Sequence, residues 1–130
     1  RWRGGGVDDE LTGGMRFEGG LVAHFDCSLT MERCEFVEAA GTDGHLRADA
    51  AFLPGTGDVV LEEHRGREGL VEHGVAGADE YLRMVEHFAD CVLQGTPLRY
   101  PAAEAAANMR AMEALYRSAR SGRWEPVVAP

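Results

Sequence analysis

The densest group of side chains that could do chemistry is the short run His24, Asp26, Cys27 and Ser28. Imidazole, carboxylate and thiolate groups are all ligands that zinc accepts. On a β-strand, His24 and Asp26 would point to one face and Cys27 to the other, so only two ligands would converge. Two protein ligands do not make a zinc site. We therefore predict no metal site, and interpret the run as a polar or partner-facing surface.

The same run contains the residue types of a Ser–His–Asp hydrolase. Ser28, Asp26 and His24 would all lie on one strand, without the strand–turn–helix elbow and the oxyanion loop that such enzymes use. Two glycine clusters, Gly4–Gly6 and Gly55–Gly57, do not complete a G-x-G-x-x-G pattern and do not lead from a strand into a helix. We therefore predict no catalytic and no cofactor-binding residue in this chain.

Charge and composition argue against several other classes of function. All thirteen basic residues are Arg, so no ammonium group can donate a proton or form a Schiff base. The formal net charge is −9 without a basic cluster, which argues against nucleic acid or an anionic membrane as a partner. No run approaches the ~18 apolar residues of a membrane span. Three widely spaced cysteines, Cys27, Cys34 and Cys91, indicate small buried thiols in a reducing cytosol, and hence a cytoplasmic protein.

Three pairs of strands are expected in the first part of the chain. The turns between them contain the glycines that tight turns favour, at Glu18–Gly20, Gly41–Gly44 and Arg65–Gly69. The flanking strands are Glu10–Phe17 with Leu21–Thr30, Arg33–Ala40 with His45–Ala50, and Asp58–His64 with Leu70–Val75.

The second of these strands alternates between two kinds of side chain. Its apolar face would belong to the core. Its other face would be uncovered and mixed in character, which suits a solvated or partner-facing surface. The predicted core face is Leu21, Ala23, Phe25, Cys27 and Leu29, and the predicted open face is Val22, His24, Asp26 and Ser28.

Two amphipathic helices are expected in the last third of the chain. The first begins after the N-cap Asp79 and ends at Gly95, and Pro97 prevents its continuation. The second begins at Pro101 and ends at Gly122. Their predicted buried stripes are Tyr81, Met84, Val85, Phe88 and Val92 in the first helix, and Ala105, Met109, Met112, Tyr116 and Ala119 in the second.

Strands followed by helices predict an α+β fold, with a predominantly antiparallel open sheet and two C-terminal helices packed on one of its faces. A length of 130 residues predicts a single domain, residues 1–130. The chain starts at Arg1 rather than Met, as expected of a fragment or a processed product.

Four segments in this order resemble one protein family. Gly14–Phe25 is similar to its hairpin of an apolar strand, Gly-Gly and a second strand, and Glu35–Leu46 is similar to its element of a strand, G-T-x-G and a strand. Tyr81–Asp90 resembles its first C-terminal helix, and Asn108–Arg123 resembles its last helix and exit. Together they resemble the C-terminal domain of the glucose–fructose oxidoreductase / inositol dehydrogenase / MocA family.

This resemblance implies a parent enzyme with two domains. An N-terminal Rossmann domain, absent from this sequence, would bind NAD or NADP and supply the lysine that usually transfers the proton. This chain would form one wall of the cleft for a sugar, polyol or related small-molecule substrate. Its open sheet face would pair with another subunit of a homo-oligomer, and the chain alone would bind no cofactor and be inactive.

One alternative stays open. The chain could be a free-standing α+β module that binds a partner protein or a small molecule through its open sheet. The coding sequence upstream of Arg1 distinguishes the two, because only the enzyme needs a G-x-G-x-x-G unit there.

Overall fold

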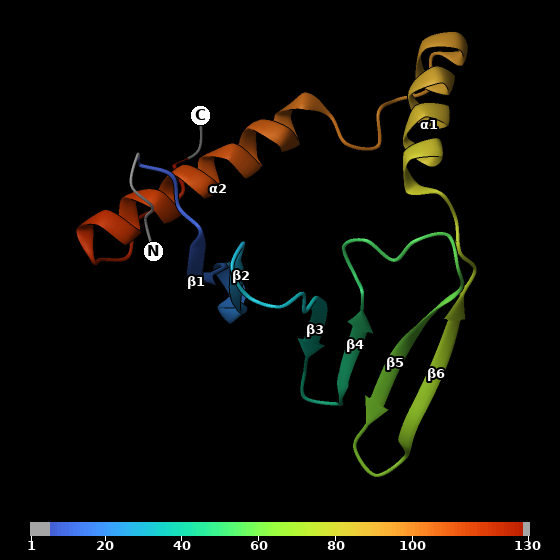
Figure 1. Cartoon of the computed structure of the whole chain (residues 1–130), viewed down its shortest axis with the longest axis horizontal. Helices are drawn as coiled ribbons and strands as arrows, with labels where there is room; N and C mark the ends of the chain where they lie inside the picture. Colours follow the sequence, from blue (N-terminus) through green and yellow to red (C-terminus); the bar gives the residue numbers. More distant parts are fainter. Residues whose placement is uncertain (1–5, 129–130) are drawn as a thin grey trace. The chain divides into compact units, whose positions relative to one another are not determined.

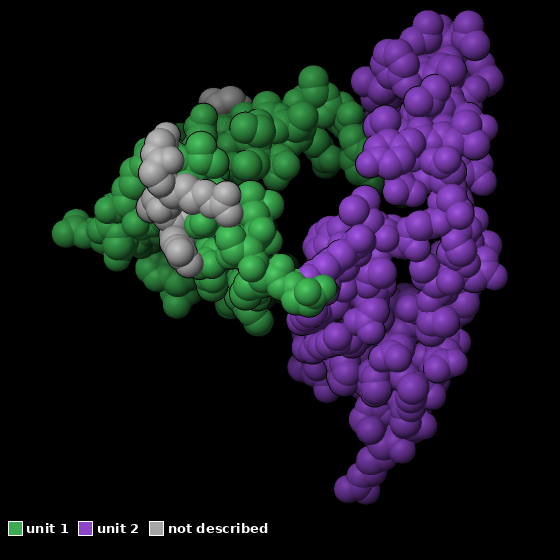
Figure 2. All heavy atoms as spheres, in the orientation of Figure 1, with its two compact units in different colours: residues 1–32, 99–130 green, residues 33–98 purple. Residues whose placement is uncertain are grey.

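A computed structural model describes residues 6–128 of the protein. The chain forms two compact units (Figure 2). The hairpin unit contains the residues up to Glu32 together with those from Arg99 onward, and the sheet unit contains residues 33–98. Each unit combines antiparallel strands with one helix, so the predicted α+β class with two C-terminal helices is confirmed. The strands form a two-stranded and a four-stranded sheet rather than one continuous sheet.

The hairpin unit is built on strands β1 (Glu10–Arg16) and β2 (Val22–Ser28), which pair antiparallel along their whole length (Figure 1). The short 3₁₀ turn η1 (Glu18–Gly20) connects them. Gly19 and Gly20 have φ angles of 81° and 90° in this turn. Side chains disfavour that region of backbone space, which explains why two consecutive glycines stand at the turn.

Helix α2 (Ala102–Ser121) covers the apolar face of this hairpin. A Cβ added to Gly13 of β1 would lie 2.9 Å from the Phe25 ring and 3.2 Å from Leu115 Cδ2 of the helix. The missing side chain of Gly13 is therefore what lets Leu115 and Phe25 meet over β1. Ala114, next to Leu115, is 4% exposed and is the one buried apolar residue in the described part of the chain.

The buried stripe of α2 differs from the predicted one. Met109 and Met112 are exposed, whereas Ala111, Leu115 and Ser118 are half-buried on either side of Ala114. The prediction chose the larger apolar side chains. In the structure the most buried position is instead Ala114, and Leu115 is the side chain that reaches the hairpin.

The sheet unit contains four consecutive strands and helix α1. β3 (Phe36–Ala40), β4 (His45–Asp49), β5 (Val59–Arg65) and β6 (Gly69–Val75) pair antiparallel in chain order. All three predicted hairpins are therefore confirmed.

Helix α1 (Glu80–Gln94) has the predicted ends. The Asp79 carboxylate accepts a hydrogen bond from the Leu82 amide at 3.0 Å, and Gly95 closes the helix with a φ of 70°. The predicted burial of its apolar stripe is wrong, since Phe88 is 60% exposed and no residue of α1 is buried. Helical spacing decides which residues share a face, but covering that face requires a tertiary contact.

A polar contact ties the start of the described chain to α2. The Tyr116 hydroxyl donates a hydrogen bond to Asp8 Oδ1 at 3.0 Å. This bond, together with the charge of the Asp8 carboxylate, raises the pKa of Tyr116 above its ordinary value of 10.0. The neighbouring Asp9 is 5% exposed, and its carbonyl oxygen accepts from the Leu29 amide at 2.9 Å. The segment before β1 is therefore held by both the helix and the hairpin.

Substituting Gly13→Ala should destabilise the protein by about 1–3 kcal/mol, because the new methyl group would overpack the contact between Phe25 and Leu115. Gly74→Ala is the matched control, since Gly74 also lies in a strand but has open space around it and no positive φ. That control should change stability by less than about 1 kcal/mol. Urea unfolding followed by circular dichroism measures both, and equal stability of the two variants would contradict the packing described above.

The stability of the protein should decrease as the pH rises above about 10. The raised pKa of Tyr116 means that the folded state holds the phenolic proton more tightly than the unfolded chain, so stabilisation is complete below the ordinary pKa and is lost as the pH rises through the raised one. Urea unfolding at a series of pH values should show this decline in the wild type and in Tyr100→Phe. Tyr116→Phe should flatten it, and an unchanged decline in that variant would exclude the Tyr116–Asp8 contact as its cause.

Candidate functional site

The predicted open face lies on β2, on the side of the hairpin opposite Phe25. Val22 is 61% exposed, and His24 and Asp26 are exposed as well. These three side chains share one face because they alternate along the strand. They form an open, mixed surface at the edge of a two-stranded sheet.

Ser28, the fourth residue of the predicted open face, has a local role. Its hydroxyl oxygen accepts hydrogen bonds from the backbone amides of Thr30 at 3.0 Å and Met31 at 3.3 Å. Such side-chain-to-backbone bonds stabilise turns. The Thr30 hydroxyl also donates to Glu10 Oε1 at 2.9 Å, which links this turn to the start of β1. Ser28 thus stabilises the turn that follows β2.

The tail after α2 covers part of the same face. A Cβ added to Gly14 would lie 3.6 Å from Trp124 Cη2. The Arg16 guanidinium stacks over the Trp124 ring, with its Cζ 4.6 Å from the ring centroid. Gly14 pairs with His24 and Arg16 pairs with Val22, so all four share one face. The tail therefore contacts the face at Gly14, where the expectation was a wholly uncovered face, but the residues of this face on both strands stay largely exposed.

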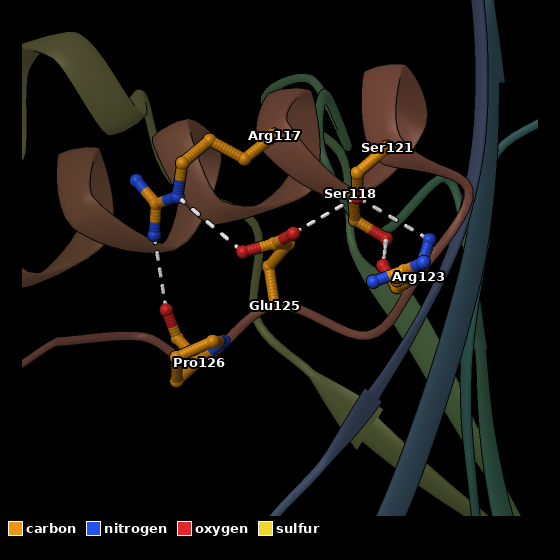
Figure 3. Close-up of polar contacts among 6 residues, drawn as sticks. All are labelled: Arg117, Ser118, Ser121, Arg123, Glu125 and Pro126. Carbon is orange, nitrogen blue, oxygen red and sulfur yellow. Dashed lines mark hydrogen bonds and ion pairs between the residues drawn. The ribbon is translucent and has the colours of Figure 1, made fainter.

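Polar contacts hold this tail against the C-terminal turns of α2 (Figure 3). Gly122, with a φ of 68°, turns the chain back, and Trp124–Val128 continues as an extended tail rather than a strand. The segment Asn108–Arg123, which resembles the family's last helix, therefore ends in a turn that directs the chain back along α2. Its hydrogen bonds run from Ser118 Oγ to the Arg123 carbonyl at 2.6 Å, from Ser121 Oγ to Glu125 Oε1 at 2.9 Å, and from Arg117 Nη2 to the Pro126 carbonyl at 3.0 Å.

In the sheet unit, Glu63 joins two basic side chains across β5 and β6. Its carboxylate accepts a hydrogen bond from the Arg65 guanidinium and lies 2.7 Å from His73 Nε2. The bond from Arg65, and then the one to His73, hold the pKa of Glu63 below its ordinary value of 4.5. The sequence pattern of a single strand could not predict this contact of His73, because its partner Glu63 lies on the neighbouring strand.

A second pair crosses from β4 to β5. His45 and His64 are directly opposite in the register, and their rings stack with centroids 4.3 Å apart and planes 10° from parallel. Glu62 Oε2 lies 3.7 Å from His64 Nε2. Sequence reasoning missed this pair, because the long loop between β4 and β5 leaves their register open. The only available signal is that both residues stand next to a turn on the same side of the sheet.

The thiols are more exposed than predicted. Cys27 and Cys34 are exposed, and only Cys91 is half-buried, with its Sγ 3.6 Å from His87 Nε2. The i, i+4 spacing on α1 brings this thiol and imidazole together, and His87 is half-buried. Within residues 6–128, no three or more His, Cys, Asp and Glu side chains are grouped to hold a metal ion.

Among the described residues, neither helix combines the length and the apolarity needed to cross a bilayer. The candidate binding groups in the described chain are the cross-strand pairs and the open face of β2.

Comparison with known proteins assigns the chain to a family. The model of the oxidoreductase family, C-terminal alpha/beta domain, matches residues 1–127. A curated relative, D-xylose 1-dehydrogenase (NADP(+)) 2 of Haloferax volcanii, is 30% identical over 119 residues, which cover 90% of this chain and 36% of the relative. The uncharacterized oxidoreductase ORF334 of Rhizobium meliloti is 28% identical over 127 residues, covering 94% of this chain and 38% of that protein. No solved structure gives a significant match.

The chain therefore spans little more than a third of the length of these relatives. The family match covers both units, from the residues before β1 to the tail that packs along α2. It agrees with the resemblance found in the two glycine-containing hairpins and the two helices. This protein belongs to the glucose–fructose oxidoreductase / inositol dehydrogenase / MocA oxidoreductase family, as its C-terminal alpha/beta domain.

Proposed function

We propose that the chain is the substrate and oligomerisation domain of an NAD(P)-dependent oxidoreductase that acts on a sugar, a polyol or a related carbonyl–alcohol pair. The family match over residues 1–127 carries this proposal. The relative named as an NADP-dependent D-xylose dehydrogenase supports a sugar-like substrate. The proposed parent enzyme also contains a Rossmann domain that binds NAD or NADP.

The composition of the chain supports this division of labour. A nicotinamide cofactor supplies or accepts the hydride when it is bound. The chain contains no Lys, so a proton-transferring lysine has to come from the dinucleotide-binding domain. The contribution of this chain is then to form one wall of the substrate cleft and to hold subunits together, and by itself it has no activity.

The open β2 face supports the oligomer part of the proposal. Val22 offers exposed apolar surface there, flanked by His24 and Asp26. An isologous contact across a two-fold axis would set each His24 near the Asp26 of the other copy, because both copies use the same patch. Such a pairing combines apolar burial with a hydrogen bond between an imidazole and a carboxylate.

The isolated chain should not bind NADH or NADPH. Titration with either cofactor should leave cofactor fluorescence unchanged beyond dilution, because the residues that bind the dinucleotide lie in the other domain. The D-xylose dehydrogenase relative is a positive control for NADPH under the same conditions. Saturable micromolar binding by this chain would overturn the proposed division of labour.

Reading the coding sequence upstream of Arg1 tests the proposal directly. A G-x-G-x-x-G unit about 120 or more residues earlier supports the two-domain enzyme. A start codon immediately before Arg1 would overturn it in favour of the free-standing binding module.

The chain should form dimers through the β2 face at tens of micromolar, an order-of-magnitude range for a weak interface. Val22→Glu should give monomers in sedimentation experiments, because the substitution would bury an unpaired carboxylate in the apolar part of the contact. Val60→Glu is the control, since Val60 is also an exposed strand valine but lies in the sheet unit. A wild type that stays monomeric, or a Val60→Glu variant that dissociates in place of Val22→Glu, would contradict this interface.

A further inference from the structure

The four-stranded sheet has one polar face, and the stacked histidines lie on it. Opposite residues of antiparallel strands point to the same side, so the register identifies every member of this face. The rings of His45 and His64 are half-exposed at its end, beside the hollow between the two hairpin turns. The charged members of the face are Glu38, Arg47, Asp49, Glu62 and Glu72.

This face favours a cation. It carries four carboxylates and one guanidinium besides the two histidines. Arg47 is already paired, at 2.9 Å from Asp49 and 3.7 Å from Glu38. The Glu62 carboxylate lies beside the imidazoles, with Oε2 3.7 Å from His64 Nε2. The Arg65 guanidinium nearby is bonded to Glu63 on the opposite face of the sheet.

The spacing of the two imidazoles suits a shared ion. Directly opposite residues of an antiparallel pair have Cβ atoms about 5 Å apart. The rings stack nearly parallel, so their in-plane nitrogen lone pairs do not converge as they stand, and a shared ion requires both rings to rotate about their side-chain bonds. The ladder from β4 to β5 keeps the two residues directly opposite each other.

We propose that His45 and His64 form a two-imidazole site for a divalent transition metal that imidazole binds strongly, such as Ni²⁺ or Cu²⁺. Two nitrogens come from the protein, and water fills the remaining positions. Glu62 is within reach to orient His64 or to bind a coordinated water. A site with two protein ligands exchanges its metal readily, and it links β4 to β5 when it is occupied.

Calorimetric titration of the tag-free chain with Ni²⁺, at a pH where an unperturbed imidazole is neutral, tests the site. One ion should bind per chain. His45→Gln, His64→Gln and the double variant should each lose at least about tenfold in affinity, since even the loss of a group that only orients a ligand costs that much. His73→Gln is the matched control, because His73 lies on the other face of the same sheet, and it should bind as the wild type does.

His45→Phe separates metal binding from ring stacking. A phenyl ring can keep the stack on His64 but cannot coordinate, so this variant should fold normally and still lose Ni²⁺ binding. Electron paramagnetic resonance of the Cu²⁺-loaded chain should show two coordinated nitrogens in the wild type and one in each single variant.

Three results would overturn the site: no saturable Ni²⁺ binding by the wild type, equal loss of binding in His73→Gln, or full binding retained by His45→Phe.

Discussion

Side chains of an antiparallel strand alternate between two faces, and a sheet with one apolar face is stable only when something covers that face. The hairpin unit meets this requirement internally. Because Gly13 has no side chain, Phe25 and Leu115 can meet over β1. Ala114, next to Leu115 on α2, is buried beside this contact. The order of this unit, from the segment before β1 to the tail after α2, depends on that contact.

The sheet unit meets the same requirement incompletely. Its apolar face includes Val37, Leu46 and Val71, all of which are exposed, and the stripe of α1 that contains Phe88 is exposed too. Apolar surface of this extent is typical of a protein that buries more when it assembles with a partner. It accords with the proposed role as one domain of a larger enzyme, whose relatives are about two and a half times as long as this chain.

The titratable side chains described above form small hydrogen-bonded groups of two or three residues. Tyr116 bonds to Asp8, and Glu63 bonds to Arg65 and His73, each through one or two hydrogen bonds near solvent. Exposed pairs of this kind add little stability and do not activate a nucleophile. Under the proposed function the redox chemistry belongs to the dinucleotide-binding domain, and the proposed histidine site on the sheet is a separate binding capacity.

The sequence by itself determined the elements, because their signals are local. Glycines at Glu18–Gly20 and at Gly41–Gly44 predicted the turns, Asp79 and Gly95 predicted the ends of α1, and alternation predicted the two faces of β2. The family resemblance rested on these same local elements, which is why it could be recognised before the structure and was confirmed by the family match.

Only the tertiary structure decided which surfaces meet. Ala114 is buried whereas Met109 and Met112 are exposed, because burial on a helix depends on the partner surface as well as on the helix itself. The pairing of His45 with His64 required the register across a long loop, and the position of Trp124 over Gly14 required the turn at Gly122. These contacts join residues far apart in the chain, so no local pattern of side chains contains them.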